Sequence, residues 1–356
     1  MGVKPATDIT AIKGYIEKQD RQLINEMLNG LDLVTDLSVR RNVREPLALN
    51  KMTVDDGARP LNLDIEKAKG GRKWTKRVLT PQRAMKIIKM VPEELRETFM
   101  SEMLDINAKQ VPFAQWVWAQ EFAKIAAEIN NNFYYSEFHG EPDEWASGDT
   151  YSVGDLVYFE EVIYKCVTDT SAGESPKSAA AKWKDADNQV ICDGPDALIK
   201  KALASEGLLT VNTGTFDDTD AYEYVKEMWS TIPEEQKDKG MEANVSFGVH
   251  EDISIRSNTL FGSGKGISGV DIEEGRPFAM KGTSGRLIIK PRTWMRGSRR
   301  VIITHPGNLI VGMNQISDAN KVGKLVETLH GFRAIVKWMI GAQFRDIANL
   351  YVNDQS

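Results

Sequence analysis

The stretch GRLIIKPRTWMRGSRRVIITHPGNLIVGMN, residues 285–314, carries the strongest structural pattern in the chain. Its three short apolar runs, RLIIKP, RVIITH and NLIVGM, are separated by glycine, proline and basic residues. Short runs of isoleucine, leucine and valine between turn residues are typical of β-strands. Two similar segments follow, KLVETLHGFRAIVKWMIGAQF (324–344) and ANLYV (348–352). The last hundred residues or so are therefore predicted to be rich in strands.

Composition indicates an ordinary globular protein of two or three packed units. The chain has 356 residues, of which 27% are charged and 41% hydrophobic, and a net charge of −6. This charge gives no reason to expect tight wrapping around nucleic acid. The two cysteines, Cys166 and Cys192, are too few for a disulfide framework, so we expect reduced thiols. No run approaches the ~20 apolar residues of a membrane span, and the start lacks an apolar signal segment, so we expect no membrane association and synthesis in a cytoplasm.

A projecting β-hairpin is predicted within residues 43–80. Three apolar residues alternate with polar ones before Gly70-Gly71, and Trp74 and Lys76 alternate after it, which favours two strands joined by a glycine turn. A two-stranded hairpin is marginal alone, and little apolar sequence lies nearby to cover this one. The alternative is a hairpin covered locally by its own chain. The apolar and aromatic residues of this predicted hairpin are Leu61, Leu63, Ile65 and Trp74, and the family resemblance described below implies that they reach a neighbouring chain.

Helical periodicity predicts most of the remaining elements. An apolar stripe in residues 1–42 with no adjacent core suggests a terminal segment that docks onto another chain. Residues 112–132 have the strongest helix pattern, because the run after Pro112 spans about 30 Å without glycine or a further proline. Residues 243–249 alternate like a strand. The other predicted helices cover residues 80–90, 92–104, 195–207 and 217–240, with Asp217 or Asp218 as the cap of the last.

No constellation of residues supports a catalytic or metal site. The run GSGKG (262–266) lacks the full phosphate-loop pattern, so a surface loop is the better interpretation. The four histidines have neither metal-ligand nor triad spacing, and the paired carboxylates lie in polar, loop-like sequence. We therefore predict a protein that is not an enzyme and has no cofactor.

Two basic clusters occur, at residues 67–77 and 292–300. Such runs are usually solvated loops. The alternative is contact with an acidic neighbouring chain or with nucleic acid through non-specific phosphate attraction. Arginine forms planar bidentate pairs, so the candidates for such contacts are Arg292, Arg296, Arg299 and Arg300.

The segment WASGDTYSVGDLVYFEEVIYKC (145–166), with Trp183 beyond it, has a different character from the rest. Its aromatic residues and Gly154-Asp155 stand in an order that resembles the small chitin-binding type of carbohydrate-binding module, over about 45 residues. The resemblance implies a three-stranded unit in which exposed rings stack on sugars. In so small a unit, the same rings are also the only available core. Cys166 and Val167 stand where such modules often carry a further aromatic residue. The residues for either role are Trp145, Tyr151, Tyr158, Tyr164 and Trp183.

The chain outside residues 141–188 resembles the major capsid protein of a tailed bacteriophage, the Hong Kong 97 type fold. The resemblance is carried by residues 285–314 and 322–352, with the landmarks Pro306, Asn308-Leu309, Gly312, Gly341 and Gln343, and by the helix at 112–132 after an extended loop. It implies an α+β fold with an N-terminal arm (1–42), an extended hairpin loop (43–80), a peripheral domain with a spine helix (81–140 and 321–342) and an axial domain (189–320 and 343–356). The small all-β module (141–188) would be inserted after the spine helix.

The resemblance also implies a geometric function. Identical chains would form hexamers and pentamers of an icosahedral shell around the phage genome, as part of the virion, with the module displayed outward for shell stabilisation or weak glycan adhesion. The implied partners are further copies of the chain, a portal, scaffold or decoration proteins, and packaged double-stranded DNA. The alternatives are an encapsulin-like cellular shell and a carbohydrate-active enzyme that bears a binding module.

Overall fold

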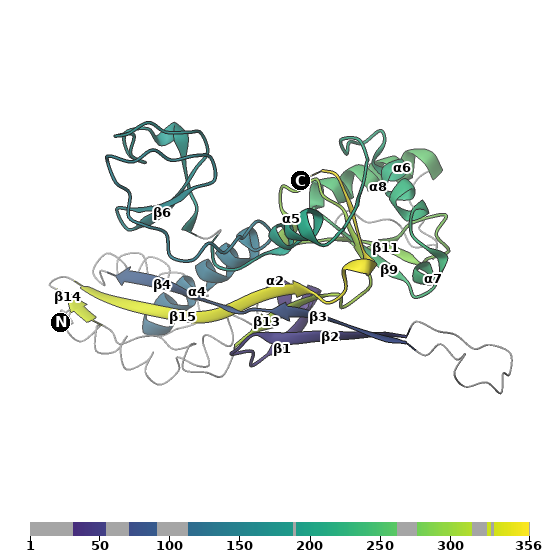
Figure 1. Ribbon diagram of the computed structural model, residues 1–356, viewed down its shortest axis with the longest axis horizontal. Coiled ribbons are helices and arrows are strands. Elements are labelled where there is room, and N and C mark those ends of the chain that lie inside the picture. The colour runs from purple at the N-terminus through teal and green to yellow at the C-terminus, as the bar shows by residue number, and fades with distance from the viewer. Residues whose placement is uncertain are drawn as a thin grey trace, which may run out of the picture. The chain divides into compact units, whose positions relative to one another are not determined.

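The computed structural model describes residues 31–54, 71–90, 113–187, 190–261, 276–314, 326–328 and 331–355, and the chain folds as two compact units (Figure 1). The first unit contains residues 1–35, 82–197 and 313–341. The second contains residues 36–81, 198–312 and 342–356. Each unit is thus assembled from three separate pieces of the chain.

A six-stranded sheet forms the centre of the second unit. Its strands follow the order β10 (Phe278–Ala279), β11 (Leu287–Pro291), β9 (Met241–Val245), β12 (Ile302–Thr304), β16 (Leu350–Asn353) and β8 (Thr210–Val211). Helices α6 (Ala221–Ser230) and α8 (Phe247–Phe261) lie side by side next to β9 and β11 (Figure 1). Apolar side chains from these helices and strands form one buried cluster, so the apolar runs recognised in the sequence supply the core of this unit.

Smaller elements complete the second unit. They are β1 (Ser38–Arg41), β2 (Leu47–Val54), β3 (Arg72–Leu79), α7 (Glu234–Lys237), η4 (Thr293–Met295), β13 (Leu309–Met313) and η5 (Ile347–Asn349). Helix α5 (Pro195–Ser205) begins in the first unit, and α2 (Asp32–Asp36) ends at the start of the second.

The first unit is built on the long helix α4 (Phe113–Asn132) and three strands, β4 (Gln82–Met90), β14 (Val326–Thr328) and β15 (Gly331–Phe344), the last of which ends in the second unit. β15 pairs antiparallel with β4 over nine residues, from Phe332↔Met90 to Ile340↔Gln82. Lys86 on β4 pairs with Glu128 on α4 at 3.1 Å. The helix predicted at 112–132 is therefore present.

The helix predicted over residues 80–90 is wrong, because this segment is strand β4. Its side chains alternate: Ala84 and Ile88 are buried, whereas Met85 and Ile87 are exposed. This period of two fits the nine-residue pairing with β15, which outweighs the helical propensity of the segment. The helix predicted at 92–104 lies outside the described residues.

A hairpin is present within the predicted range, and in the part of the chain that the structure describes its strand β3 pairs with a segment before the predicted first strand. β3 pairs antiparallel with β2, with Met52 opposite Trp74 and Leu47 opposite Leu79. The partner of β3 is thus the earlier segment 47–54, whose Leu49 packs with Leu79 in a small buried cluster. Leu61, Leu63 and Ile65 lie outside the described residues.

Two further differences concern helices of the second unit. The segment predicted as one helix, 217–240, forms α6 and the short α7, and Asp217 shapes the turn before α6 by accepting hydrogen bonds from the backbone of Thr219 and Asp220. The strand predicted at 243–249 ends at Val245, where α8 soon begins. The sequence of α8 contains a glycine and several β-branched residues, so the helical propensity of this segment is low.

A small three-stranded antiparallel sheet is inserted after α4. It consists of β5 (Leu156–Phe159), β6 (Val162–Cys166) and β7 (Trp183–Asp185), in that order, with the short helix η2 (Ala180–Lys182) before β7. β5 and β6 are joined by a two-residue turn, Glu160-Glu161, in which both residues have positive φ. Such turns match the twist of a β-hairpin.

The segments that enter and leave this insertion are bonded to each other, and we call them the stem (residues 133–138 and 192–196). Gly194 N donates to Ser136 O at 2.7 Å, and Asp196 N donates to Tyr134 O at 3.1 Å. Cys192 N also donates to Ser136 Oγ at 3.2 Å. Tyr134, Ser136 and Cys192 are buried, so the insertion begins and ends at one closely packed place.

Candidate interaction surfaces

The hairpin β2–β3 presents one apolar face to solvent. Residues opposite each other in an antiparallel pair share a face, and Met52 and Trp74 are such a pair. Trp74 is 67% exposed and Met52 44%, and Val54 and Val78 on the same face are also exposed. Exposed tryptophan side chains are uncommon in monomers and frequent at protein interfaces. This hairpin face is therefore the strongest candidate for a contact with another chain among the described residues.

The opposite face of the hairpin is anchored in the second unit. Leu49 and Leu79 pack with Val43 and Ile310. Gly312 permits this contact, because a Cβ at that position would lie 2.5 Å from Leu79 Cδ2. The hairpin is thus fixed at its base.

Landmark residues of the sequence pattern hold the hairpin base and the last strands together. Gln343 donates from Nε2 to Val78 O at 2.9 Å and accepts from Arg77 Nη2 at 2.8 Å. Asn308 donates from Nδ2 to Thr304 Oγ1 and to Asp346 O, both at 2.8 Å, and its Oδ1 accepts from Asp346 N. These residues therefore have structural roles that explain the amide side chains at their positions.

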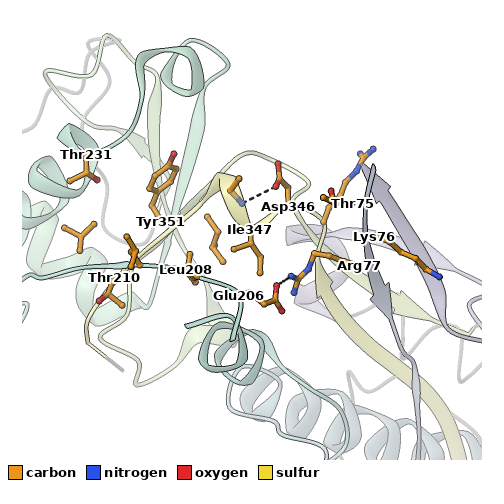
Figure 2. A pocket seen from close by; sticks show the side chains of 16 residues that line it. Thr75, Lys76, Arg77, Glu206, Leu208, Thr210, Thr231, Asp346, Ile347 and Tyr351 are labelled. Carbon is orange, nitrogen blue, oxygen red and sulfur yellow. Dashed lines mark hydrogen bonds and ion pairs between the residues drawn. The ribbon is translucent and has the colours of Figure 1, made fainter. Parts of the chain in front are cut away.

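A groove of about 770 Å³ lies in the second unit beside β3 (Figure 2). It is lined by residues 75–77, 206–211, 231, 345–348 and 350–351. Its two carboxylates are each paired with a cation: Glu206 with Arg77, as Figure 2 shows, and Asp346 with Lys51 at 2.5 Å. Both carboxylates of the groove are therefore held in ion pairs with cations of the same unit.

The aromatic residues of the inserted sheet mostly face its interior. Trp183 is buried with Val157 and Cys166, and Trp145, Tyr151 and Tyr164 pack against this cluster. The rings of Tyr151 and Trp183 meet edge to face, with centroids 5.4 Å apart. Tyr158 differs, because 41% of it is exposed. The structure therefore uses four of the five predicted rings in the core and leaves Tyr158 at the surface.

The predicted surface role of the arginine cluster is wrong for Arg292 and Arg300, which are buried. Arg292 donates from Nε to Asn244 Oδ1 at 2.6 Å, and its guanidinium pairs with Asp36 at 2.6 Å. Arg299 pairs with Asp252 at 2.8 Å but remains half exposed. Arg296 is exposed. The cluster therefore serves mainly to hold the interior of the second unit together.

Arg292→Ala is expected to destabilise the second unit by roughly 2 kcal/mol, because it removes the buried cation that pairs with Asp36, whereas Glu242 keeps its pair with Lys290. Arg296→Ala is the matched control, for which a change within about 0.5 kcal/mol is expected. Urea unfolding of both variants measures the difference. Equal stability of the two variants would contradict this structural role.

The described residues contain no group of three or more histidine, cysteine or carboxylate side chains that could hold a metal ion. Two of the histidines have structural hydrogen bonds: His250 Nε2 to Arg276 O at 2.9 Å, and His305 Nδ1 to Gly240 O at 2.8 Å. Burial raises the pKa of the Cys192 thiol to about 12, so this cysteine is not a reactive nucleophile. Among the helices that the structure describes, none has both the length and the apolar character needed to cross a bilayer.

The two-unit α+β arrangement, with its anchored hairpin, long helix and strand-rich C-terminal part, is the fold of capsid shell proteins. A chain of the solved "Satellite phage P4 procapsid including size determination (Sid) protein" matches with a TM-score of 0.51 at 10% identity, over 94% of this chain and 89% of that chain. The predicted fold class, the Hong Kong 97 type capsid fold, is thereby confirmed.

Two other solved structures align with lower TM-scores. "The capsid of Myoviridae Phage XM1" matches at 9% identity and a TM-score of 0.49, over 91% of both chains. The "virus-like particle from Pyrococcus furiosus" matches at 12% identity and a TM-score of 0.43, over 95% of this chain and 98% of that chain. No protein-family model and no curated protein sequence matches this chain.

Proposed function

We propose that this chain is the major capsid protein of a tailed bacteriophage, and that copies of it assemble into hexamers and pentamers of an icosahedral shell around double-stranded DNA. The observation that carries the proposal is the match to a procapsid chain over 94% of the sequence. The exposed apolar face of the hairpin supports it, because a shell subunit needs a surface that another copy covers.

Each region of the chain would then have its own role in the shell. Residues 1–42 would be an arm and 43–80 a hairpin loop that reach neighbouring copies. Residues 81–140 and 321–342 would form the peripheral domain, and 189–320 and 343–356 the axial domain around the capsomer axis. Portal, scaffold and decoration proteins would be further partners, and the packaged DNA would make non-specific contacts. Synthesis would take place in the bacterial host cytoplasm.

The inserted module, residues 141–188, would stabilise the shell from its outer side. One of its five predicted rings, Trp183, is buried and three others pack against it partly buried, which favours this role over sugar binding, because a stacking platform needs exposed rings. The exposure of Tyr158 supports weak adhesion to glycans as a second role, in which many copies compensate for low affinity.

Electron microscopy of the purified full-length protein tests the proposal. We expect closed shells or capsomers. A protein that stays monomeric at high concentration would overturn it. Shells that form around a cargo enzyme, with no portal gene nearby, would instead indicate an encapsulin-like compartment.

Trp74→Ala is expected to abolish shell formation. Truncation of a central tryptophan at an interface costs about 2 kcal/mol or more per contact, and a shell repeats each contact many times. The melting temperature of the unassembled protein should not change, because Trp74 is 67% exposed. Thr53→Ala is the matched control, since Thr53 is an exposed residue on the opposite face of the same hairpin. Normal shells from Trp74→Ala would contradict the predicted contact.

A further inference from the structure

The sheet of β4 and β15 has an outward face with cations around an apolar centre. Ala84 and Ile88 turn inward, so their neighbours on β4 turn outward. The outward apolar residues are Met85, which is 62% exposed, and Ile87, which is 50% exposed. Ile87 lies directly opposite Ile335, which is half-buried. These residues form the apolar centre.

Four cations surround this centre. Met85 lies opposite Lys337, and Lys89 lies opposite Arg333, while Arg83 precedes Met85 on the same face. All four cations are exposed. Exposed isoleucine and methionine inside a basic rim are typical of a surface that a partner covers. We call this surface, which comprises Arg83, Met85, Ile87, Lys89, Arg333, Ile335 and Lys337, the basic face.

The inserted module has the opposite charge. Residues 141–188 contain 11 aspartate and glutamate residues and 4 lysines, which gives a net charge of −7. The whole chain has 51 acidic and 45 basic residues, so the remainder has 40 acidic and 41 basic residues and a net charge of +1. All of the net negative charge of the protein therefore resides in the module.

One patch of the module is complementary in charge to the basic face. Glu144 and Tyr158 form a β-bridge, so their side chains are adjacent. Tyr158 N also donates to the backbone oxygen of Asp143 at 2.8 Å, which fixes this edge segment against β5. Asp143, Glu144 and Tyr158 are all exposed. The patch, which we call the acidic patch, thus has the Tyr158 ring next to the Glu144 carboxylate, with Asp143 at its edge.

The module and the basic face already meet at one point within a single chain, outside the acidic patch. Glu161, in the turn between β5 and β6, pairs with Lys89 at one end of the basic face. The hydrogen bond from Lys89 holds the pKa of Glu161 below its ordinary value, and the charge of Arg333 acts in the same direction. Both side chains of the pair are largely exposed, so this contact alone contributes little stability. Met85 and Ile87 remain uncovered.

We infer that the acidic patch of one copy docks onto the basic face of a second copy. The inference rests on the proposed shell function and names the surface that the module would bind. Charge complementarity would orient the two surfaces, and burial of Tyr158 against Met85 and Ile87 would supply the attraction. A second copy is the favoured occupant, because every copy carries one acidic patch for each basic face.

A charge exchange between copies tests the inference. Lys337→Glu and Glu144→Lys are each expected to lower the equilibrium constant for shell assembly roughly tenfold at low salt, since each places like charges opposite each other. The double variant should recover most of the loss. Lys226→Glu, an exposed charge on α6, is the control and should assemble normally. Assembly is measured by sedimentation of a concentration series.

Cysteine pairing identifies the partner directly. Shells are assembled from a mixture of two single variants, Tyr158→Cys and Ile87→Cys, and then oxidised. Disulfide-linked dimers above the level given by either variant alone would support the inference, because the natural cysteines are buried.

Three results would overturn the inference while the wild type forms shells. They are unchanged assembly by both charge variants, no recovery in the double variant, and no mixed dimer. Recovery of Lys337→Glu by Asp64→Lys, rather than by Glu144→Lys, would assign the basic face to the hairpin loop instead. If the wild type forms neither shells nor capsomers, the proposed function fails as well.

Discussion

Gly194→Ala is expected to destabilise the first unit by more than roughly 3 kcal/mol, the upper end of the usual cost of overpacking. A Cβ on this residue would lie 1.9 Å from Phe133 O and 2.8 Å from Tyr134 O. Both are backbone atoms of the stem, so no side chain can rotate to relieve the overlap. Thermal unfolding and the yield of soluble protein measure the effect.

Gly148→Ala is the matched control for this variant. No atom lies within 4 Å of the position that its Cβ would take, and its backbone does not have positive φ. We expect an unchanged melting temperature. If Gly194→Ala also melted at the wild-type temperature, the two segments of the stem would have to pack less closely than the structure indicates.

Trp183→Ala is expected to unfold the inserted module. The ring is only 6% exposed, contacts Tyr151 and donates from Nε1 to Glu174 O at 3.2 Å. Loss of a buried tryptophan typically costs about 3–5 kcal/mol, and a unit of this size has no second core to compensate. Limited proteolysis should therefore cleave the variant within residues 141–188 and leave the rest of the chain intact.

Tyr158→Ala separates the structural role of the rings from a binding role. Because Tyr158 is 41% exposed, the module of this variant should stay resistant to protease. Loss of retention on chitin by Tyr158→Ala would support glycan adhesion. A Trp183→Ala module that resisted protease as well as the wild type would show that the aromatic cluster is not its core.

Much of the fold was predictable where local patterns and tertiary packing agree. The strands at residues 287–291, 302–304 and 309–313 follow from apolar runs bounded by turn residues, and α4 follows from a long stripe of helical period. The three-stranded insertion was expected from a resemblance to a family of small modules, which the order of its aromatic residues and Gly154-Asp155 suggested. In each case, one short segment contains enough information to define the element.

The segment 82–90 could not be assigned in this way. Its sequence, QRAMKIIKM, suits a helix, and only the partner strand β15, some 250 residues later in the sequence, makes it a strand. The hairpin shows the same difficulty, because the pairing of Trp74 with Met52 of the earlier segment 47–54 was not predicted. Pairing between distant segments depends on tertiary contacts that local periodicity does not reveal.

The candidate sites were harder to predict than the fold. A basic run in the sequence does not distinguish the buried Arg292 from the exposed Arg296, because both follow the same pattern of charge. The basic face was missed because its cations belong to two distant strands and gather only when β4 and β15 pair. Of the exposed hairpin face, Trp74 on β3 was predicted from the sequence. The contribution of β2 to the same face was not predicted.

The stem makes the chain tolerant of different inserted domains at one position. The two segments of the stem are held together by hydrogen bonds between them. The insertion is therefore a closed loop, and its content does not change the positions at which it joins the rest of the fold. Lineages could exchange, lose or duplicate the module without re-optimising the rest of the fold. For the same reason, this junction is a natural place to graft a foreign domain whose termini lie side by side, such as an antigen for display.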